Sequence, residues 1–237
     1  MLRLDKQLEN QPKEVIFCSR CVVSNQRPRL IFDKNNVCSA CHYTWRKHHQ
    51  IDWKKREEEL IALLDKHRSK DGGFDVVVPG SGGKDSGYTA HLLKEKYGMH
   101  PLTVTWAPHL YTDWGWKNFQ SWIGAGFDNY LCTPNKRVHR LLTRLALENM
   151  FHPFQPFMIG QKGLAPKMAA LFKIPLIFYG ENEAEYGNPK GDSSKSQRDW
   201  SYFIAPDTGN VFIGGVSVND LVSKYGLDKS DLNVYMP

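Results

Sequence analysis

From residue 74 onward, short apolar runs alternate with longer stretches that have a helical pattern. Predicted helices cover 85–98, 113–126, 135–150 and a stretch that ends at 173. The four predicted strands read FDVVV (74–78), PLTVTW (101–106), DNYLC (128–132) and PLIFYG (175–180). Strands that alternate with helices indicate an α/β fold with a mostly parallel sheet, covered by helices on both faces.

The loop after the first predicted strand is rich in glycine. It comprises Pro79, Gly80, Ser81, Gly82, Gly83, Lys84, Asp85 and Ser86. In parallel sheets, ligands bind beyond the carboxyl ends of the strands. A glycine-rich turn at the start of a helix presents backbone N–H groups that bind phosphate, and Lys84 adds positive charge. Asp85 is suited to hold Mg²⁺ beside the phosphates. The alternative is a flexible turn that binds nothing.

Asp85 distinguishes this loop from the triphosphatase loop, in which Ser or Thr directly follows the lysine. The segment SGGKDS (81–86) resembles the SGGxDS motif of the PP-loop ATP pyrophosphatases. The resemblance implies that ATP is cleaved between its α- and β-phosphates while a substrate oxygen attacks the α-phosphorus. It also implies that Thr105 and Trp106, at the end of the second strand, face the adenosine.

Four of the five cysteines lie in two close pairs with the spacing C-x2-C-x16-C-x2-C: Cys18, Cys21, Cys38 and Cys41. Two residues between cysteines allow one tight turn to present both sulfurs, so the pattern predicts a zinc ribbon. Because four thiolates complete a tetrahedron, the predicted Zn²⁺ is structural. Buried free cysteines and an iron–sulfur cluster are the alternatives. We interpret the nearby His42, His48 and His49 as surface residues.

These patterns divide the chain into four parts. We predict a zinc-ribbon module (1–50), a linker helix (51–73) with Asp52 at its start and Gly72 at its end, a PP-loop domain (74–205) and a C-terminal segment (206–237). Residues 185–200 are expected to form a long loop. The C-terminal segment has some strand and helix character but no decisive pattern.

Several segments together are similar to the N-acetyl sugar amidotransferases, bacterial enzymes that make acetamidino sugars for lipopolysaccharide O-antigen or flagellin glycans. They are the cysteine pairs, PGSGGKDS (79–86), VTWAPHLYTDWGWKNF (104–119) and YGENEAEYG (179–187). The resemblance implies that ATP adenylates the amide oxygen of an N-acetylated sugar and releases pyrophosphate. Ammonia then replaces the oxygen. Such proteins extend beyond the position of residue 237, so the chain is either truncated or a short relative.

The resemblance also implies site residues. Lys84, Asp85, Ser86 and Glu181 are the predicted catalytic residues, with Asp85 and Glu181 holding Mg²⁺. Candidate substrate-binding residues are Glu181, Asn182, Glu185, Lys162 and Trp114. Each has a non-functional alternative. The acidic residues could belong to a solvated loop, Lys162 to a solvated helix face, and Trp114 to the packed core. The implied partners are separate glutaminase-like and cyclase-like subunits that supply ammonia.

The remaining sequence features leave two other functions open. The net charge of +6 is compatible with small phosphorylated ligands or with nucleic acid. A PP-loop tRNA thiolase would share the loop and the cysteine pairs, but only Cys132 is left to carry sulfur. A non-catalytic zinc- and nucleotide-binding module is the second alternative. The N-terminus has no secretory signal and no long apolar run occurs, so we expect a cytoplasmic enzyme with no nucleic-acid partner and no membrane insertion.

Overall fold

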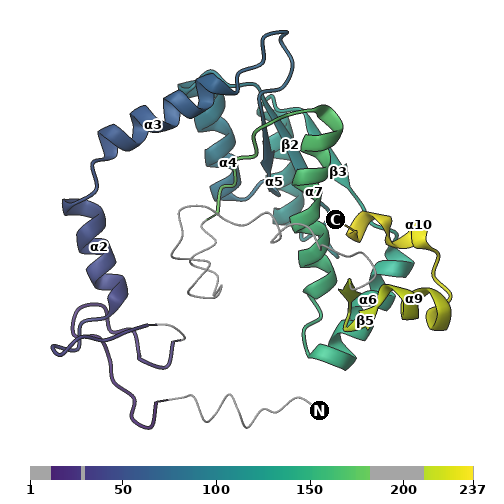
Figure 1. Cartoon of the computed structure of the whole chain (residues 1–237), viewed down its shortest axis with the longest axis horizontal. Helices are drawn as coiled ribbons and strands as arrows, with labels where there is room; N and C mark the ends of the chain where they lie inside the picture. The colour runs from purple at the N-terminus through teal and green to yellow at the C-terminus, as the bar shows by residue number, and fades with distance from the viewer. Residues whose placement is uncertain (1–11, 28–29, 182–210, 237) are drawn as a thin grey trace. The chain divides into compact units, whose positions relative to one another are not determined.

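The computed structural model describes residues 12–27, 30–181 and 211–236 (Figure 1). The described residues fall into two units, one that ends at Leu60 and one that begins at Ile61. Each unit is considered by itself below.

The first unit is built from turns around the cysteines and from helical segments. Two isolated antiparallel bridges, Phe17↔Ser24 and Phe32↔Cys38, precede helix α2 (Ser39–His49). Helix α2 was not predicted, because it buries none of its residues and therefore has no apolar stripe. Helix α3 (Trp53–Lys66), whose residues from Ile61 onward belong to the second unit, begins after Asp52. The side chain of Asp52 accepts a hydrogen bond from the backbone N–H of Lys55. The helix ends before the predicted Gly72.

The second unit contains a parallel sheet of three strands in the order β1-β2-β3. The strands are β1 (Val76–Pro79), β2 (Pro101–Trp106) and β3 (Asn129–Cys132). All three were predicted, and β2 has the predicted bounds. Pro79 pairs with Val104, and Trp106 pairs with Cys132, so the carboxyl ends of the strands lie at one edge of the sheet.

The predicted fourth strand is reduced to a single parallel bridge, Val77↔Ile177. The backbone N–H of Val77 donates to Leu176, and that of Phe178 donates to Val77, both at 2.9 Å. The next bond of such a ladder would need an N–H at position 79, and proline has none. The residue that opens the glycine-rich loop therefore also stops this pairing.

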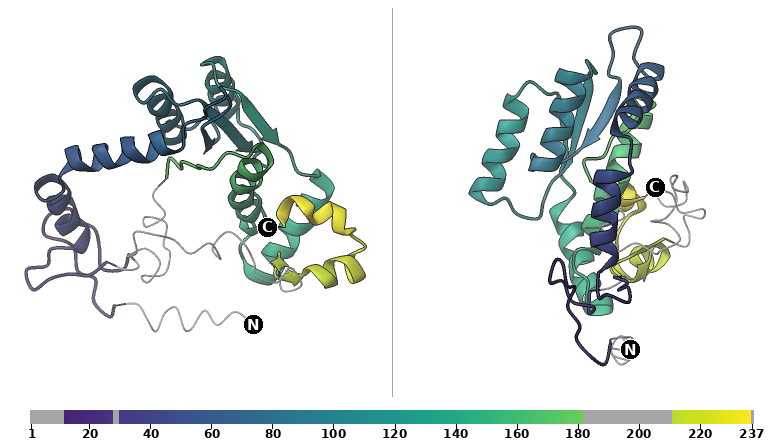
Figure 2. Two further views of the ribbon diagram at one scale, coloured as in Figure 1. Left: turned by 45° about the horizontal axis from the view of Figure 1, so that its top comes forward. Right: turned by 90° about the vertical axis from the view of Figure 1, so that its left-hand side faces the viewer.

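Helices cover both faces of the sheet, as the alternating pattern predicted. Helices α4 and α5 lie on one face and α7 on the other (Figure 2). The predicted helix 85–98 is instead α4 followed by one wide π-helical stretch, in which the N–H of Tyr97 bonds to the carbonyl of Leu92. The bounds are α4 (Lys84–His91), η1 (Leu92–Lys96), α5 (Asp113–Gly124), α6 (Lys136–Met150) and α7 (Gln155–Phe172).

The C-terminal residues, which had no decisive sequence pattern, belong to the core of the second unit. Their elements are β4 (Phe212–Ile213), β5 (Val216–Ser217), α9 (Val218–Tyr225), α10 (Lys229–Leu232) and the short 3₁₀-helix η5 (Asn233–Tyr235). Ile213, Leu221 and Leu232 are fully buried in the cluster that also contains Val77 and Leu142. This segment therefore contributes to the stability of the unit.

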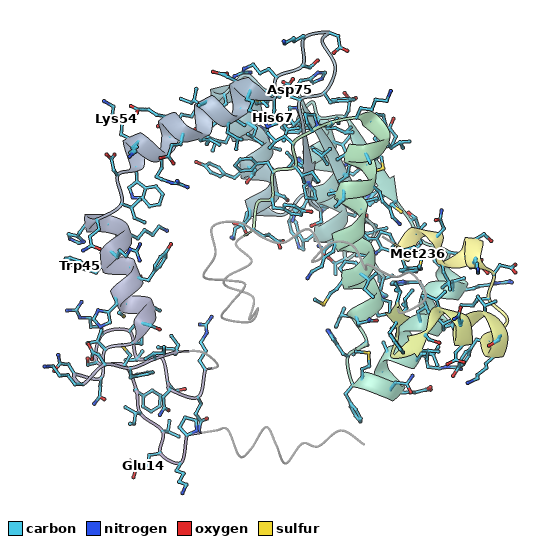
Figure 3. All side chains as sticks on the ribbon, in the orientation of Figure 1. Glu14, Trp45, Lys54, His67, Asp75 and Met236 are labelled. Atoms are coloured by element: carbon cyan, nitrogen blue, oxygen red, sulfur yellow. The ribbon has the colours of Figure 1, made fainter. Side chains whose placement is uncertain are left out.

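Asp75 is a buried carboxylate at the start of the sheet (Figure 3). Its side chain accepts hydrogen bonds from the backbone N–H groups of Ser69 and His100, the latter at 2.9 Å. The N–H of Asp75 in turn donates to the carbonyl of His100. One buried side chain thus accepts hydrogen bonds from two backbone N–H groups and joins the segment before β1 to the segment before β2.

The contact between α7 and the sheet depends on Gly160. A Cβ atom at this position would lie 2.2 Å from Cζ2 of Trp106, far inside van der Waals contact. Trp106 is 5% exposed and packs edge-on to Tyr235, with ring centroids 5.6 Å apart. Only glycine allows the helix to approach the tryptophan ring this closely.

Replacing Gly160 by alanine should therefore destabilise the protein by about 1–3 kcal/mol, since the added methyl group overpacks the core. The midpoint of urea denaturation measures this change. Gly163→Ala is the matched control on the same helix, because a Cβ at position 163 meets nothing within 4 Å. It should leave stability unchanged or raise it by about 0.5–1 kcal/mol. Equal effects of both substitutions would contradict this account.

Candidate functional site

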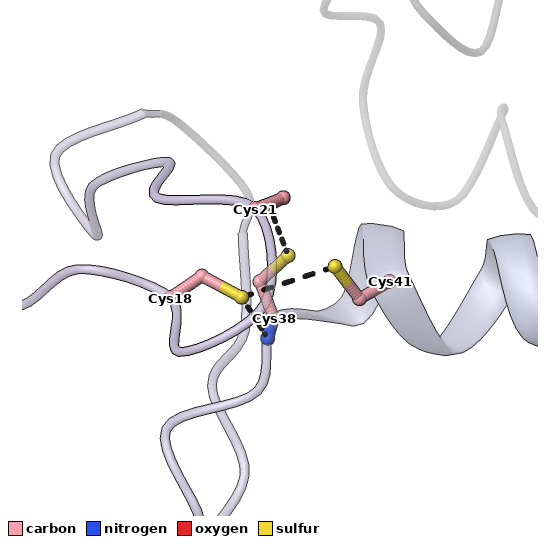
Figure 4. A group of neighbouring side chains, drawn as sticks. All are labelled: Cys18, Cys21, Cys38 and Cys41. Atoms are coloured by element: carbon pink, nitrogen blue, oxygen red, sulfur yellow. Dashed lines mark hydrogen bonds between the residues drawn. The ribbon is translucent and has the colours of Figure 1, made fainter.

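The four cysteine sulfurs of the first unit converge (Figure 4). All four lie within 4.8 Å of one another, with 3.8 Å between Cys18 and Cys41 and 3.6 Å between Cys21 and Cys38. A tetrahedral Zn²⁺ with Zn–S bonds of about 2.3 Å separates its sulfurs by roughly 3.8 Å. The spacing therefore fits zinc, as the sequence predicted. No other group of three or more candidate metal ligands occurs among the residues the structure describes.

The backbone around Cys18 favours its thiolate form. Burial opposes ionisation, but the N–H groups of Arg20, Cys38 and Cys21 lower the pKa of Cys18 to about 6. A thiolate is the form that binds metal. Nearby His42 is exposed, which agrees with its interpretation as a surface residue, and it hydrogen-bonds to Asp33 at 2.8 Å.

The glycine-rich loop joins β1 directly to α4. The backbone N–H of Gly80 continues the sheet by donating to Val104 at 2.9 Å. Gly83 then caps α4 with an extended backbone. The N–H groups of Ser81, Gly82 and Gly83 make no hydrogen bond to any described residue. These groups precede a helix N-terminus, where anions are favoured by the backbone dipoles.

Two of the loop glycines are required by protein packing. A Cβ at Gly80 would lie 2.4 Å from that of Ser86 and 2.7 Å from the Trp122 ring. A Cβ at Gly82, where φ is +82°, would lie 2.7 Å from the carbonyl oxygen of Asn118 on α5. Gly83 differs, since its nearest neighbour would be Ser81 Oγ at 3.9 Å. Space for a ligand is therefore left at Gly83.

Lys84 and Asp85 form an exposed ion pair. Lys84 Nζ lies 2.6 and 2.8 Å from the two carboxylate oxygens of Asp85. Ser86 Oγ donates to the carbonyl of Gly83 at 3.3 Å. An exposed pair contributes at most about 1 kcal/mol, so a ligand or metal ion can separate it at little cost.

The segment that follows the isolated bridge at Ile177 packs against the start of α4, next to the glycine-rich loop. A Cβ at Gly180 would lie 2.9 Å from the carbonyl carbon and oxygen of Asp85 and from Cα of Ser86. The structure thus brings the YGE segment, with Glu181 exposed beside Gly180, against the first turn of α4. β1 leads into α4 on one face of the sheet, whereas the Ile177 segment follows α7 on the other face, and α/β proteins bind ligands at such positions. Asn182 and Glu185 lie outside the described residues.

The residues predicted to face adenosine have buried side chains. Thr105 is fully buried, and its Oγ1 accepts a hydrogen bond from Asn129 Nδ2 at 3.0 Å. Trp106 packs in the core against Gly160. Any contact of these two residues with a nucleotide would therefore come from their backbone.

The other predicted substrate residues are spread over different elements. Trp114 on α5 is 74% exposed, and Lys117 Nζ lies 4.7 Å from its ring centre. Lys162 is half-buried on α7. Lys167, also on α7, has a structural role, because its Nζ donates to the carbonyls of Asn233 at 2.7 Å and Val234 at 3.1 Å.

Sequence reasoning missed a cluster of His109, His139 and Tyr235. Nδ1 of His139 lies 2.8 Å from Tyr235 Oη, and its Nε2 lies 2.9 Å from His109 Nε2. The available signal was a histidine among the apolar residues that α6 buries, which include Val138 and Leu142. Its partners come from distant parts of the sequence and could not be read from that pattern.

Cys132, at the end of β3, is half-buried. Burial raises the pKa of its thiol, although the charge of Lys167 acts in the opposite direction. Its thiol is therefore less ionised than an ordinary cysteine at neutral pH.

Comparisons with known proteins add limited information. No known family model matches the chain. Over 88 residues it is 31% identical to an uncharacterized protein of Methanocaldococcus jannaschii, a match that covers 37% of this chain and 31% of that protein. The chain thus spans about a third of the length of this curated relative. None of the described helices is long and apolar enough to cross a membrane.

Among solved structures, an NH3-dependent NAD synthetase from Campylobacter jejuni is similar over 57% of this chain and 59% of its own. The TM-score is 0.40 and the sequence identity is 16%. A likeness this distant carries no information about the activity of the chain.

The zinc centre is testable by removing one sulfur. Cys38→Ser should lower bound zinc from about one ion per chain to near zero, because a structural site needs all four thiolates. Metal analysis of the purified protein measures the zinc content. Cys132→Ser is the control and should retain full zinc. Retention of zinc by the Cys38 variant would contradict the assignment.

Proposed function

We propose that the chain is a PP-loop ATP pyrophosphatase that forms AMP and pyrophosphate. The observation that carries this proposal is the SGGKDS loop, with its three unpaired N–H groups among the described residues, packed against the Gly180 segment. Lys84 and the loop N–H groups would hold the departing pyrophosphate. Their contribution is the stabilisation of negative charge that develops as the bond breaks.

Asp85 and Glu181 are the residues that would hold Mg²⁺. Both are exposed carboxylates, and Gly180 packs on the backbone of Asp85. Magnesium prefers oxygen ligands and supplies charge neutralisation at phosphates. Binding of the ion by Asp85 would weaken the ion pair that this carboxylate forms with Lys84.

For the acceptor, we propose the amide oxygen of an N-acetylated sugar, which ammonia then replaces to give an acetamidino sugar. An amide carbonyl is a poor electrophile, and adenylation converts its oxygen into a leaving group. The support for this acceptor is the resemblance of the segments 104–119 and 179–187 to the N-acetyl sugar amidotransferases. Glutaminase-like and cyclase-like subunits would supply the ammonia, in the cytoplasm.

A tRNA thiolase is the less favoured proposal. Sulfur transfer needs a nucleophilic thiolate, whereas burial raises the pKa of the Cys132 thiol. The four cysteines of the first unit have the spacing of a closed zinc centre and would not be available for this step.

The proposed reaction is tested by substrate-dependent ATP–pyrophosphate exchange. UDP-N-acetylglucosamine should stimulate exchange, and Lys84→Ala or Asp85→Asn should reduce the rate by about 100-fold or more, because each removes a group that offsets charge at the phosphates. Lys70→Ala, which removes an exposed lysine that precedes β1 and lies outside the loop, should leave the rate unchanged.

Other outcomes distinguish the alternatives. Stimulation by tRNA and not by the sugar nucleotide would favour a thiolase. Binding of ATP without pyrophosphate release under either condition would favour a non-catalytic module. Full exchange activity in the Lys84 and Asp85 variants would contradict the role of the loop.

A further inference from the structure

Three side chains in the second unit form a hydrogen-bonded chain that the proposed function has not yet used. Tyr235 on η5 is buried, His139 on α6 is buried, and His109 in the loop after β2 is exposed. His139 lies between the other two, with its Nδ1 2.8 Å from Tyr235 Oη and its Nε2 2.9 Å from His109 Nε2. The chain therefore leads from the core to an imidazole at the surface.

Thr143 determines which ring nitrogens of His109 and His139 carry a proton. Its hydroxyl donates to the backbone carbonyl of His139 at 2.7 Å, so its oxygen can only accept from His109 Nε2, which lies 3.4 Å away. His109 then carries its proton on Nε2. Nε2 of His139 must accept from it, and the proton on Nδ1 of His139 is donated to Tyr235. The lone pair of His109 Nδ1 consequently points away from the cluster.

His139 remains neutral within this arrangement. Burial and the charge of His109 lower the pKa of His139 to about 4. Burial also raises the pKa of the Tyr235 hydroxyl, with a contribution from Cys132 on β3. Lys167 on α7 is a further titratable group near Tyr235, and its Nζ donates to the carbonyls of residues 233 and 234. A neutral His139 carries one proton, so when its Nδ1 donates to Tyr235 its Nε2 can only accept a hydrogen bond from His109.

The ring of His109 is also held by packing. It stacks on Phe157 with centroids 5.5 Å apart and meets the edge of Phe154 at 5.9 Å, both near the start of α7. Among the described residues, no partner bonds to its Nδ1. An exposed loop histidine is thus held in one orientation with one nitrogen free.

This nitrogen belongs to a loop that leaves the sheet beside the glycine-rich loop. The N–H of Gly80 bonds to Val104, and the N–H of Ala107 bonds to Cys132, so β2 is paired on both sides up to its last residues. Adjacent strands lie about 4.8 Å apart. The loops after β1 and β2 therefore begin next to each other at the carboxyl edge, and His109 is two residues beyond the last paired residue.

We propose that His109 is the proton acceptor of the second half of the reaction, with Thr143, His139 and Tyr235 as positioning residues. This role rests on the proposed function. The ammonia nitrogen forms a bond to the activated carbon and gives one proton to Nδ1 of His109. The carbon–oxygen bond to AMP then breaks, and AMP leaves with the electron pair. His109 afterwards releases its proton to solvent.

The proton positions can be tested without any substrate. In histidine labelled with ¹⁵N, NMR of the whole chain should show His109 protonated at Nε2 and unprotonated at Nδ1 when it is neutral. Thr143→Val removes the hydroxyl acceptor at nearly constant volume and should shift His109 toward the Nδ1-protonated form. Thr143→Ser keeps the hydroxyl and should restore the original tautomer. A His109 that carries its proton on Nδ1 in the unsubstituted protein would overturn the proposal.

The kinetic test separates the two half-reactions with ATP, UDP-N-acetylglucosamine and ammonium chloride as probes. His109→Gln should leave ATP–pyrophosphate exchange within about 2-fold of the unsubstituted protein but slow ammonia-dependent AMP release by about 100-fold, as expected for loss of a general base. In the pH profile of AMP release, the fall in rate at low pH that reflects the need for an unprotonated group should disappear. Tyr235→Phe should slow the same step by a smaller factor, and His152→Gln, an exposed histidine of the same unit, should have no effect.

The outcomes distinguish a failure of the role of His109 from a failure of the proposed function. Unchanged ammonia-dependent AMP release in His109→Gln, with exchange intact, would overturn only the role of His109. A parallel loss of exchange and AMP release would indicate a structural role and also overturn it. Absence of exchange in the unsubstituted protein would overturn the proposed function and with it the reaction step assigned to His109.

Discussion

The parallel pairing of β1 with β2 is the constraint on which the candidate nucleotide site depends. It continues past the last residue of β1 through the hydrogen bond from Gly80 to Val104, so the glycine-rich loop leaves the sheet in a fixed direction. On its other side, β1 ends its pairing at Pro79, which has no N–H to donate. The chain after Phe178 is then free to turn and pack through Gly180 against the start of α4.

The loop owes its shape to contacts with the protein. Gly80 fits under Ser86 and Trp122, and Gly82 lies against the backbone of α5 at a positive φ. The N–H groups of the loop are thus held in place by the protein itself, which is the preorganisation that the proposed binding of pyrophosphate would require. The same logic applies to His109, whose ring is held by Phe157 and by its hydrogen bond to His139.

The three strands of the parallel sheet and most helices of the second unit could be predicted, because apolar periodicity reflects which face is buried. Helix α2 escaped prediction since it buries nothing, and the π-helical stretch η1 leaves no sequence signature. The convergence of the four cysteines and the position of the loop were predicted from spacing and residue type. The cluster around His139 was not, because its partners lie 30 and 96 residues away, and only tertiary packing brings α6, the loop after β2 and η5 together.

The sequence by itself determined the α/β architecture, the four convergent thiols and the position of the glycine-rich loop after the first strand. These features depend on local spacing and on the alternation of buried and exposed residues. Only the tertiary structure decided that Gly180 lies on the backbone of Asp85, that Trp106 is a core residue against Gly160, and that Lys167 binds backbone carbonyls. Such contacts join segments distant in the chain, and their distances follow from how whole helices pack on the sheet.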